Sequence, residues 1–131
     1  MKSKTISEWQ KEVYQIAKDK GWHETDNEKS FIECLMLIVS ELSEAVEEYR
    51  NNRKFDEIYT KVGSNKIEGI PVEMADVVIR IFDTCEQFGI NLEEALLIKS
   101  EYNKTRDYRH GGKFSAKLVS VKVLLHTYNI R

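Results

Sequence analysis

The segment from Pro71 to Phe88 constrains the fold most, because it is apolar around most of a helical circumference. Pro71 suits the first turn of a helix and Gly89 suits its end. A helix with so little polar surface must be covered by other elements. We therefore expect this helix to be largely buried within a helical bundle. Its apolar residues are Met74, Ala75, Val77, Val78, Ile79, Ile81, Phe82, Cys85 and Phe88.

Three further helices are predicted, over residues 8–20, 28–50 and 91–106. The second has an apolar seam at three- and four-residue steps, which is typical of a helix in a bundle. The seam residues are Leu35, Ile38, Leu42, Ala45 and Tyr49. The polar connection 51–69 has no sustained period, so we expect a loop with a short helical turn near residues 55–59. The sequence thus predicts an all-α, four-helix bundle-like fold.

Residue pairs typical of helix starts precede three of these helices. We expect Ser7 with Gln10, Thr25 with Glu28, and Asn91 with Glu94 to act as caps. The tail 115–131 is ambiguous, because its apolar residues fit both a strand and a helix. We expect a domain over 1–114 and a C-terminal extension over 115–131.

Composition indicates a soluble globular protein of 131 residues, 41% hydrophobic and 32% charged. No apolar run approaches the roughly 20 residues that span a membrane, and the N-terminus lacks a signal peptide. We expect a cytoplasmic protein with no membrane partner, in which Cys34 and Cys85 are buried. The net charge of −2 argues against binding to polymeric nucleic acid.

Two predicted helices carry paired acidic residues. Glu41 and Glu44 flank the seam of the second helix, and Glu73 and Asp76 begin the polar stripe of the third. Each pair is spaced i, i+3, so its members share a helical face. The pattern is E-x-x-E, then 28 residues, then E-x-x-D.

Four carboxylates at one edge of a bundle repel each other. A pair at about 4 Å costs roughly 1 kcal/mol in water and about 4 kcal/mol at an intermediate dielectric. Protonation, a nearby Arg or Lys, or a bound cation relieves this cost. Mg²⁺ fits best, with Mn²⁺ as a possible substitute, because hard cations take carboxylate oxygens. The competing interpretation is two solvated acidic faces. A di-iron site is rejected, because no Glu-x-x-His pair is present.

A cationic face is predicted near the end of the fourth helix. Lys99, Asn103 and Arg106 share that face, which suits the helix dipole and also suits phosphate binding. His110, in a basic Gly-containing turn with Arg109 and Lys113, extends the same charge. Trp22 has two open interpretations: stacking on a base, or closing the end of the bundle.

The three stretches LIVSELSEAVEEYR, GIPVEMADVVIRIFD and IKSEYNKTRDYRHGGK resemble the MazG-like all-α NTP pyrophosphohydrolase superfamily, which includes dimeric dUTPases and dCTPases. The resemblance covers roughly residues 9–114. It implies that Glu41, Glu44, Glu73 and Asp76 hold Mg²⁺.

The resemblance further implies that Lys99, Asn103 and Arg106 contact the phosphates of a nucleoside triphosphate. Hydrolysis would yield a nucleoside monophosphate and pyrophosphate and would serve to clear nucleotide pools, with Glu41 or Glu44 as general base. Self-association into a homodimer or a dimer of dimers is also implied. The alternatives are a non-catalytic helical interaction module and a phosphohydrolase that releases inorganic phosphate.

Overall fold

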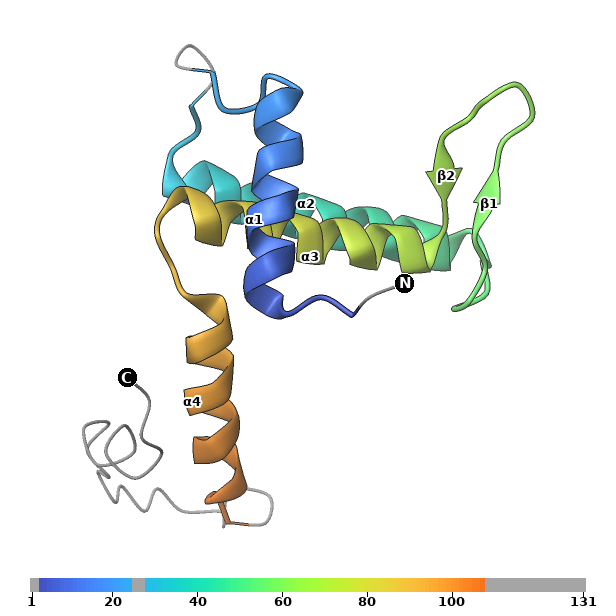
Figure 1. The fold of residues 1–131 in the computed structure, drawn as a ribbon. Helices are drawn as coiled ribbons and strands as arrows, with labels where there is room; N and C mark the ends of the chain where they lie inside the picture. The colour runs from blue at the N-terminus through green and yellow to red at the C-terminus, as the bar shows by residue number, and fades with distance from the viewer. Residues whose placement is uncertain (1–2, 25–27, 108–131) are drawn as a thin grey trace. The chain divides into compact units, whose positions relative to one another are not determined.

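The computed structural model describes residues 3–24 and 28–107, which form four helices and one short hairpin (Figure 1). The helices are α1 (Ile6–Asp19), α2 (Phe31–Arg50), α3 (Ile70–Gln87) and α4 (Leu92–Lys104). The strands β1 (Tyr59–Thr60) and β2 (Ile67–Glu68) pair antiparallel. The prediction of a mostly helical, bundle-like fold is confirmed for this part of the chain.

The first two helices begin at capping boxes that differ from the predicted ones. The Thr5 hydroxyl accepts from the Glu8 amide, and the Glu8 carboxylate accepts from the Thr5 amide. Ser30 and Glu33 form the same pair at the start of α2. Ser7 therefore lies inside the first turn of α1, because a charged Glu is a stronger acceptor than the Gln10 amide. Thr25, the cap predicted for the second helix, lies outside the described residues, and the predicted cap Asn91 of the fourth helix stays a prediction.

The connection 51–69 contains a hairpin in place of the expected helical turn. Phe55 and Asp56 form a turn, and Tyr59 already belongs to β1, where it faces Glu68. The local sequence Ile58-Tyr59-Thr60 explains the difference, because β-branched and aromatic residues favour extended backbone.

The core lies along α3. Figure 1 shows α2 beside α3 and α1 crossing the pair. Among the described residues, one buried apolar side chain comes from α1, two from α2 and three from α3. They are Val13, Cys34, Ala45, Val77, Phe82 and Cys85. Met74, Val78 and Ile79 of α3 are exposed, so this helix is less buried than the sequence predicts. The prediction that Cys34 and Cys85 are buried is confirmed, and both are free thiols.

The start of α3 depends on Gly69. Its φ of 128° is unfavourable for any residue with a side chain, and an added Cβ would lie 2.2 Å from the Glu57 carbonyl oxygen. Pro71 follows in the first turn, as predicted. This close approach of the loop to Gly69 fixes where α3 begins, and hence where Glu73 and Asp76 lie.

The chain divides into two compact units, Met1–Leu92 and Glu93–Arg131. The first unit holds α1, α2, the hairpin and α3, whereas α4 belongs to the second. The predicted boundary at residue 114 and the extension 115–131 lie outside the described residues and stay predictions. Among the described helices, none is long and apolar enough to cross a membrane.

Candidate functional site

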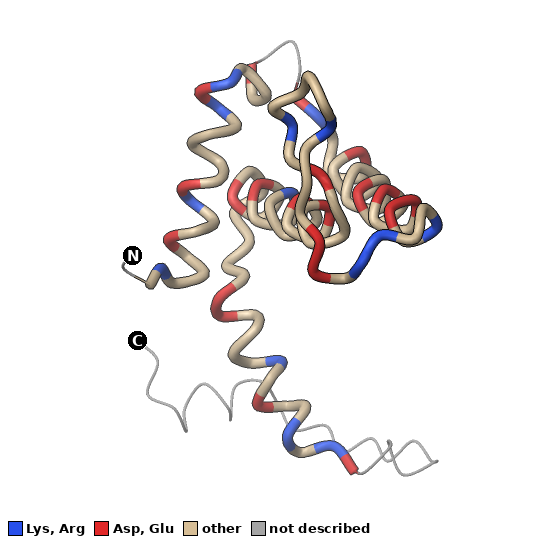
Figure 2. Tube along the Cα trace, turned by 90° about the vertical axis from the view of Figure 1, so that its right-hand side faces the viewer, with Lys and Arg blue, Asp and Glu red and all other residues tan. Residues whose placement is uncertain are grey.

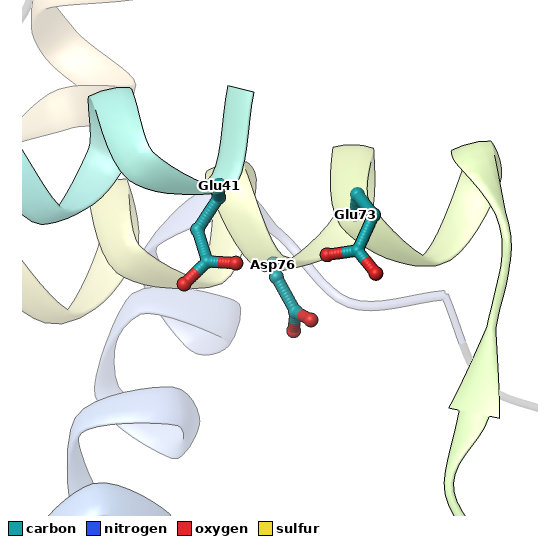
Figure 3. A group of neighbouring side chains, drawn as sticks. All are labelled: Glu41, Glu73 and Asp76. Carbon is teal, nitrogen blue, oxygen red and sulfur yellow. The ribbon is translucent and has the colours of Figure 1, made fainter. Parts of the chain in front are cut away.

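Three carboxylates converge where α2 passes the first turns of α3. One oxygen from each of Glu41, Glu73 and Asp76 lies within 4.8 Å of the others (Figure 3). Glu41 is 6% exposed and Glu73 is 5% exposed. Because acidic residues are rarely buried without a partner, this acidic cluster is an unusual feature of the first unit.

The electrostatics of the acidic cluster are unfavourable. Burial raises the pKa of Glu73, and repulsion from Glu44 and Asp76 raises it further. Burial also raises the pKa of Asp76, with Glu41 as the second cause. Within the described part of the chain, Glu73 and Asp76 accept no hydrogen bond and form no ion pair. The buried Glu73 and the half-buried Asp76 therefore lack the hydrogen bonds that folding normally provides, and only longer-range attraction from Lys66, and from Arg80 in the case of Asp76, lowers their pKa values.

Glu41 differs from its neighbours because it has a partner. The Nε of Arg80, one turn beyond Asp76 on α3, donates a hydrogen bond to Glu41 Oε1. The Arg80 side chain is 40% exposed, whereas that of Glu41 is 8% exposed. The sequence analysis assigned Arg80 no role, although its i+4 spacing from Asp76 places both residues on the same face of α3.

Glu44, the fourth predicted ligand, is exposed and lies outside the group of three. It is near enough to raise the pKa of Glu73. The structure thus brings together three of the four predicted metal ligands. It places the fourth beside them, on the solvent side of α2.

The donor set fits a hard divalent cation. Oxygen ligands of Mg²⁺ lie at about 2.1 Å from the ion, so two ligands of one ion are at most about 4.2 Å apart. The carboxylate oxygens of the cluster, which lie within 4.8 Å of one another, would need only small side-chain rotations to reach that separation. Three carboxylates with no neutral donor among them favour Mg²⁺ or Mn²⁺ over softer metals.

A cavity of about 370 Å³ opens beside the acidic cluster, between α1 and α3. Ile16 and Ile79 contribute to its apolar wall, and Glu41, Asp76 and Arg80 to its polar end. Trp22 also lines this cavity, and its side chain is 61% exposed. The indole is thus accessible to a ligand, but the base-stacking role predicted for it stays untested.

His23 and Asp83 connect the segment after α1 to α3. His23 Nε2 and Asp83 Oδ1 are 2.7 Å apart, and the imidazole lies 4.4 Å from the Tyr14 ring. Asp83 also lines the large cavity. The contact was missed by sequence reasoning, because 60 residues separate its partners.

The second unit, described by itself, contains the predicted cationic face. Lys99, Asn103 and Arg106 are all exposed on or just after α4. The Lys99 ammonium lies 4.9 Å and the Arg106 guanidinium 5.9 Å from the centre of the Tyr102 ring. Figure 2 shows acidic residues at the start of α4 and basic residues toward its end. His110 lies outside the described residues.

The distribution of charge along the chain is a second signal that sequence reasoning missed. Residues 99–131 carry eight Lys and Arg against two Asp and Glu, whereas residues 1–98 carry 12 against 20. The net charge of −2 is therefore the sum of an acidic part and a strongly basic part. A basic segment with an aromatic side chain between its cations is typical of nucleic-acid binding.

The chain is similar to a protein of Haemophilus influenzae described as an uncharacterized HTH-type transcriptional regulator. The two are 26% identical over 102 residues, which cover 78% of this chain and 82% of the relative. No family model matches the chain. No solved structure matches it significantly.

The named relative overturns the functional predictions. It is described as an uncharacterized HTH-type transcriptional regulator, and this description contradicts the assignment to the MazG-like superfamily, the hydrolase activity and the status as an enzyme. The non-catalytic interaction module is not supported either. Two predictions about partners were also wrong: that the chain binds a nucleoside triphosphate as its substrate, and that it has no polymeric nucleic acid as a partner. The role of general base predicted for Glu41 or Glu44 belonged to the hydrolase reaction and is withdrawn with it.

The physical reason lies in the low specificity of the motifs. Acid pairs at i, i+3 on two packed helices indicate a shared face and do not define a reaction. The spacing of Lys99, Asn103 and Arg106 indicates a phosphate-binding face without naming the phosphate. The predicted self-association stays a prediction.

Proposed function

We propose that this chain is a DNA-binding regulatory protein. In this proposal the cationic segment, residues 99–131, contacts the DNA backbone, and the acidic cluster of the first unit holds a divalent cation. The observation that carries the DNA-binding role is the concentration of eight basic residues against two acidic ones in the cationic segment. The HTH-type name of the Haemophilus relative supports the same role.

The exposed face of α4 supports contact with phosphates. Lys99 and Arg106 both lie close to the Tyr102 ring, so two cations and one aromatic side chain are grouped together. Arg and Lys supply charge-assisted hydrogen bonds to phosphate oxygens.

The test is binding to a fluorescein-labelled, random-sequence DNA duplex, followed by anisotropy across a series of salt concentrations. Each phosphate contact contributes about −0.9 to the slope of log K against log salt concentration. The variant Lys99→Gln/Arg106→Gln removes two contacts, so its slope should be less steep by about 1.8. Its affinity should fall for all sequences alike.

The matched control is Lys11→Gln/Lys18→Gln, which removes the same charge from exposed positions on α1. The proposal requires this control to keep the wild-type slope. Equal losses in both double variants would show that only total charge matters. No binding by the wild-type chain at low salt would end the proposal.

The second part of the proposal is a divalent cation, Mg²⁺ or Mn²⁺, on Glu41, Glu73 and Asp76. It is favoured by Glu73, which is 5% exposed and has no hydrogen-bond or ion-pair partner in the described part of the chain. A bound cation would neutralise the acidic cluster and hold α2 against α3. Two free, buried cysteines suit a reducing compartment, so we keep the cytoplasm as the proposed location.

Electron paramagnetic resonance of added Mn²⁺ tests this part directly, because bound Mn²⁺ loses the sharp signal of the free ion. The wild-type chain should bind about one ion, and excess MgCl₂ should displace it. The variant Asp76→Asn should bind more weakly, whereas Glu47→Gln, an exposed change on α2, should bind like the wild type. An Asp76→Asn variant that binds as tightly as the wild type would contradict the assignment.

A further inference from the structure

Arg80 already binds a carboxylate that a cation at the acidic cluster would need as a ligand. Its Nε donates to Glu41, the one member of the cluster with a hydrogen-bond partner in the described part of the chain. Glu41 is almost fully buried, so the guanidinium is the counter-ion available to it. The acidic cluster is therefore partly neutralised by the protein's own charge.

A divalent cation and the guanidinium cannot both stay close to Glu41 at low cost. All three cluster oxygens lie within 4.8 Å of each other, so an ion among them lies within a few ångströms of Arg80 Nε. Like charges at such distances repel by about 1 kcal/mol per pair of unit charges in water, and more at a partly buried site. Binding of the ion therefore favours departure of Arg80.

The surroundings of Arg80 allow that departure. Its side chain is 40% exposed and lines the cavity of about 370 Å³, which leaves space for a new rotamer. Asp83 lines the same cavity and offers another acceptor. His23 contacts one oxygen of Asp83, but an ionised carboxylate has about four acceptor positions.

We propose that Arg80 is a built-in counter-ion that competes with a divalent cation for Glu41 and thereby sets the cation affinity of the acidic cluster. This inference rests on the cation site proposed above. In the absence of the ion, Arg80 stabilises Glu41. When the ion binds, the guanidinium moves from Glu41 toward Asp83.

The experiment measures Mn²⁺ and Mg²⁺ affinity of the full chain by paramagnetic resonance and isothermal titration calorimetry. Arg80→Gln removes the competitor, so the dissociation constant should fall by about tenfold or more, as expected from the loss of one nearby positive charge. Arg80→Lys keeps the charge and should stay close to the wild type. Arg50→Gln, an exposed change on α2, should leave the affinity unchanged.

An independent measurement needs no variant. The Nε–H resonance of Arg80 in the ¹⁵N-labelled wild-type chain should shift as MgCl₂ is added, with the same midpoint as the binding curve. An unmoved resonance, or an Arg80→Gln affinity equal to or weaker than that of the wild type, would overturn the inference while leaving the cation site intact. Absence of cation binding by the wild-type chain would refute the site itself.

Discussion

Replacing Glu73 by Gln should stabilise the protein in the absence of divalent cations. Glu73, Asp76 and Glu41 have oxygens within 4.8 Å of each other. At 4.8 Å, one repulsive pair costs about 0.9 kcal/mol in water and about 3.5 kcal/mol at an effective dielectric of about 20. Glu73→Gln removes two such pairs and breaks no hydrogen bond of the described residues.

Two further effects decide the net value. The new amide can donate to the remaining carboxylates, which adds stability, whereas Arg80 already offsets part of the charge on Glu41. Solvent near Asp76 screens the repulsion further, so we expect a net gain of about 1–3 kcal/mol in the free energy of unfolding. Each kcal/mol raises the Tm by about 4–8 °C in a domain of 60–100 residues.

The assay is thermal unfolding followed by circular dichroism, in EDTA and in excess MgCl₂. A ligand at 100 times its Kd stabilises the folded state by about 2.7 kcal/mol, and the wild type should gain more than Glu73→Gln, which lacks one ligand. The control Glu47→Gln, at an exposed position on α2, should change stability by no more than about 0.5 kcal/mol. A Glu73→Gln protein that melts below the wild type in EDTA would refute the reasoning.

Three other changes have defined outcomes. The folded-state pKa of Glu73 lies above the ordinary value of 4.5, so the free energy of unfolding of the cation-free wild type should rise as pH falls from neutral toward 4.5. The variant Glu73→Gln/Asp76→Asn should show a flatter dependence on pH. A wild-type free energy of unfolding that decreases over this pH range contradicts the prediction. Below 4.5 the capping acids Glu8 and Glu33, whose pKa is lowered mainly by hydrogen bonds with Thr5 and Ser30, act in the opposite direction. Gly69→Ala should destabilise by about 2 kcal/mol or more in urea unfolding, because its Cβ meets the Glu57 carbonyl at 2.2 Å. The control Gly63→Ala, at a φ of 79° with nothing within 4 Å of the new Cβ, should lower the free energy of unfolding by about 1 kcal/mol. Equal losses in Gly69→Ala and Gly63→Ala would contradict the steric argument. Gln10→Ala should lower the free energy of unfolding by about 1–3 kcal/mol, because the buried Gln10 amide donates to Glu86 and to the Ile90 carbonyl at 2.8 and 3.1 Å. An unchanged free energy in the same assay would show that water replaces these two hydrogen bonds.

Periodicity predicted where the helices lie better than which residues they bury. Among the described residues, α3 supplies three of the six buried apolar side chains, but its Met74, Val78 and Ile79 are 43–47% exposed, contrary to the prediction of a largely buried helix. The hairpin was missed, because its strands have two residues each and leave no alternating pattern to detect. The capping boxes were displaced by two residues or more, because several Ser, Thr and Glu residues near each start compete for the same amides.

The acidic cluster shows where spacing stops being informative. Glu41 and Glu44 have the same separation as Glu73 and Asp76, yet Glu41 is buried and Glu44 is exposed. The difference arises from the rotation of α2 about its axis, which is set by packing of Cys34 and Ala45 in the core. Spacing alone does not specify that rotation. Arg80 was recognisable only as a polar neighbour, because its bond to Glu41 joins residues 39 apart.

The function was mispredicted because net charge was treated as a property of a surface. Coulomb interactions with a charged partner act over about 8–10 Å in physiological salt, so a partner responds to a segment and not to the whole chain. The balance of eight basic to two acidic residues over 99–131 attracts phosphate, whatever the acidic surplus of residues 1–98. The same separation motivates the two proposals made for this chain: a cation on the carboxylates of α2 and α3, and phosphate on the exposed Lys99 and Arg106. Charge should therefore be summed over each segment before a class of partner is excluded. Over the whole second unit, Glu93–Arg131, the balance is eight basic to four acidic residues and is still basic.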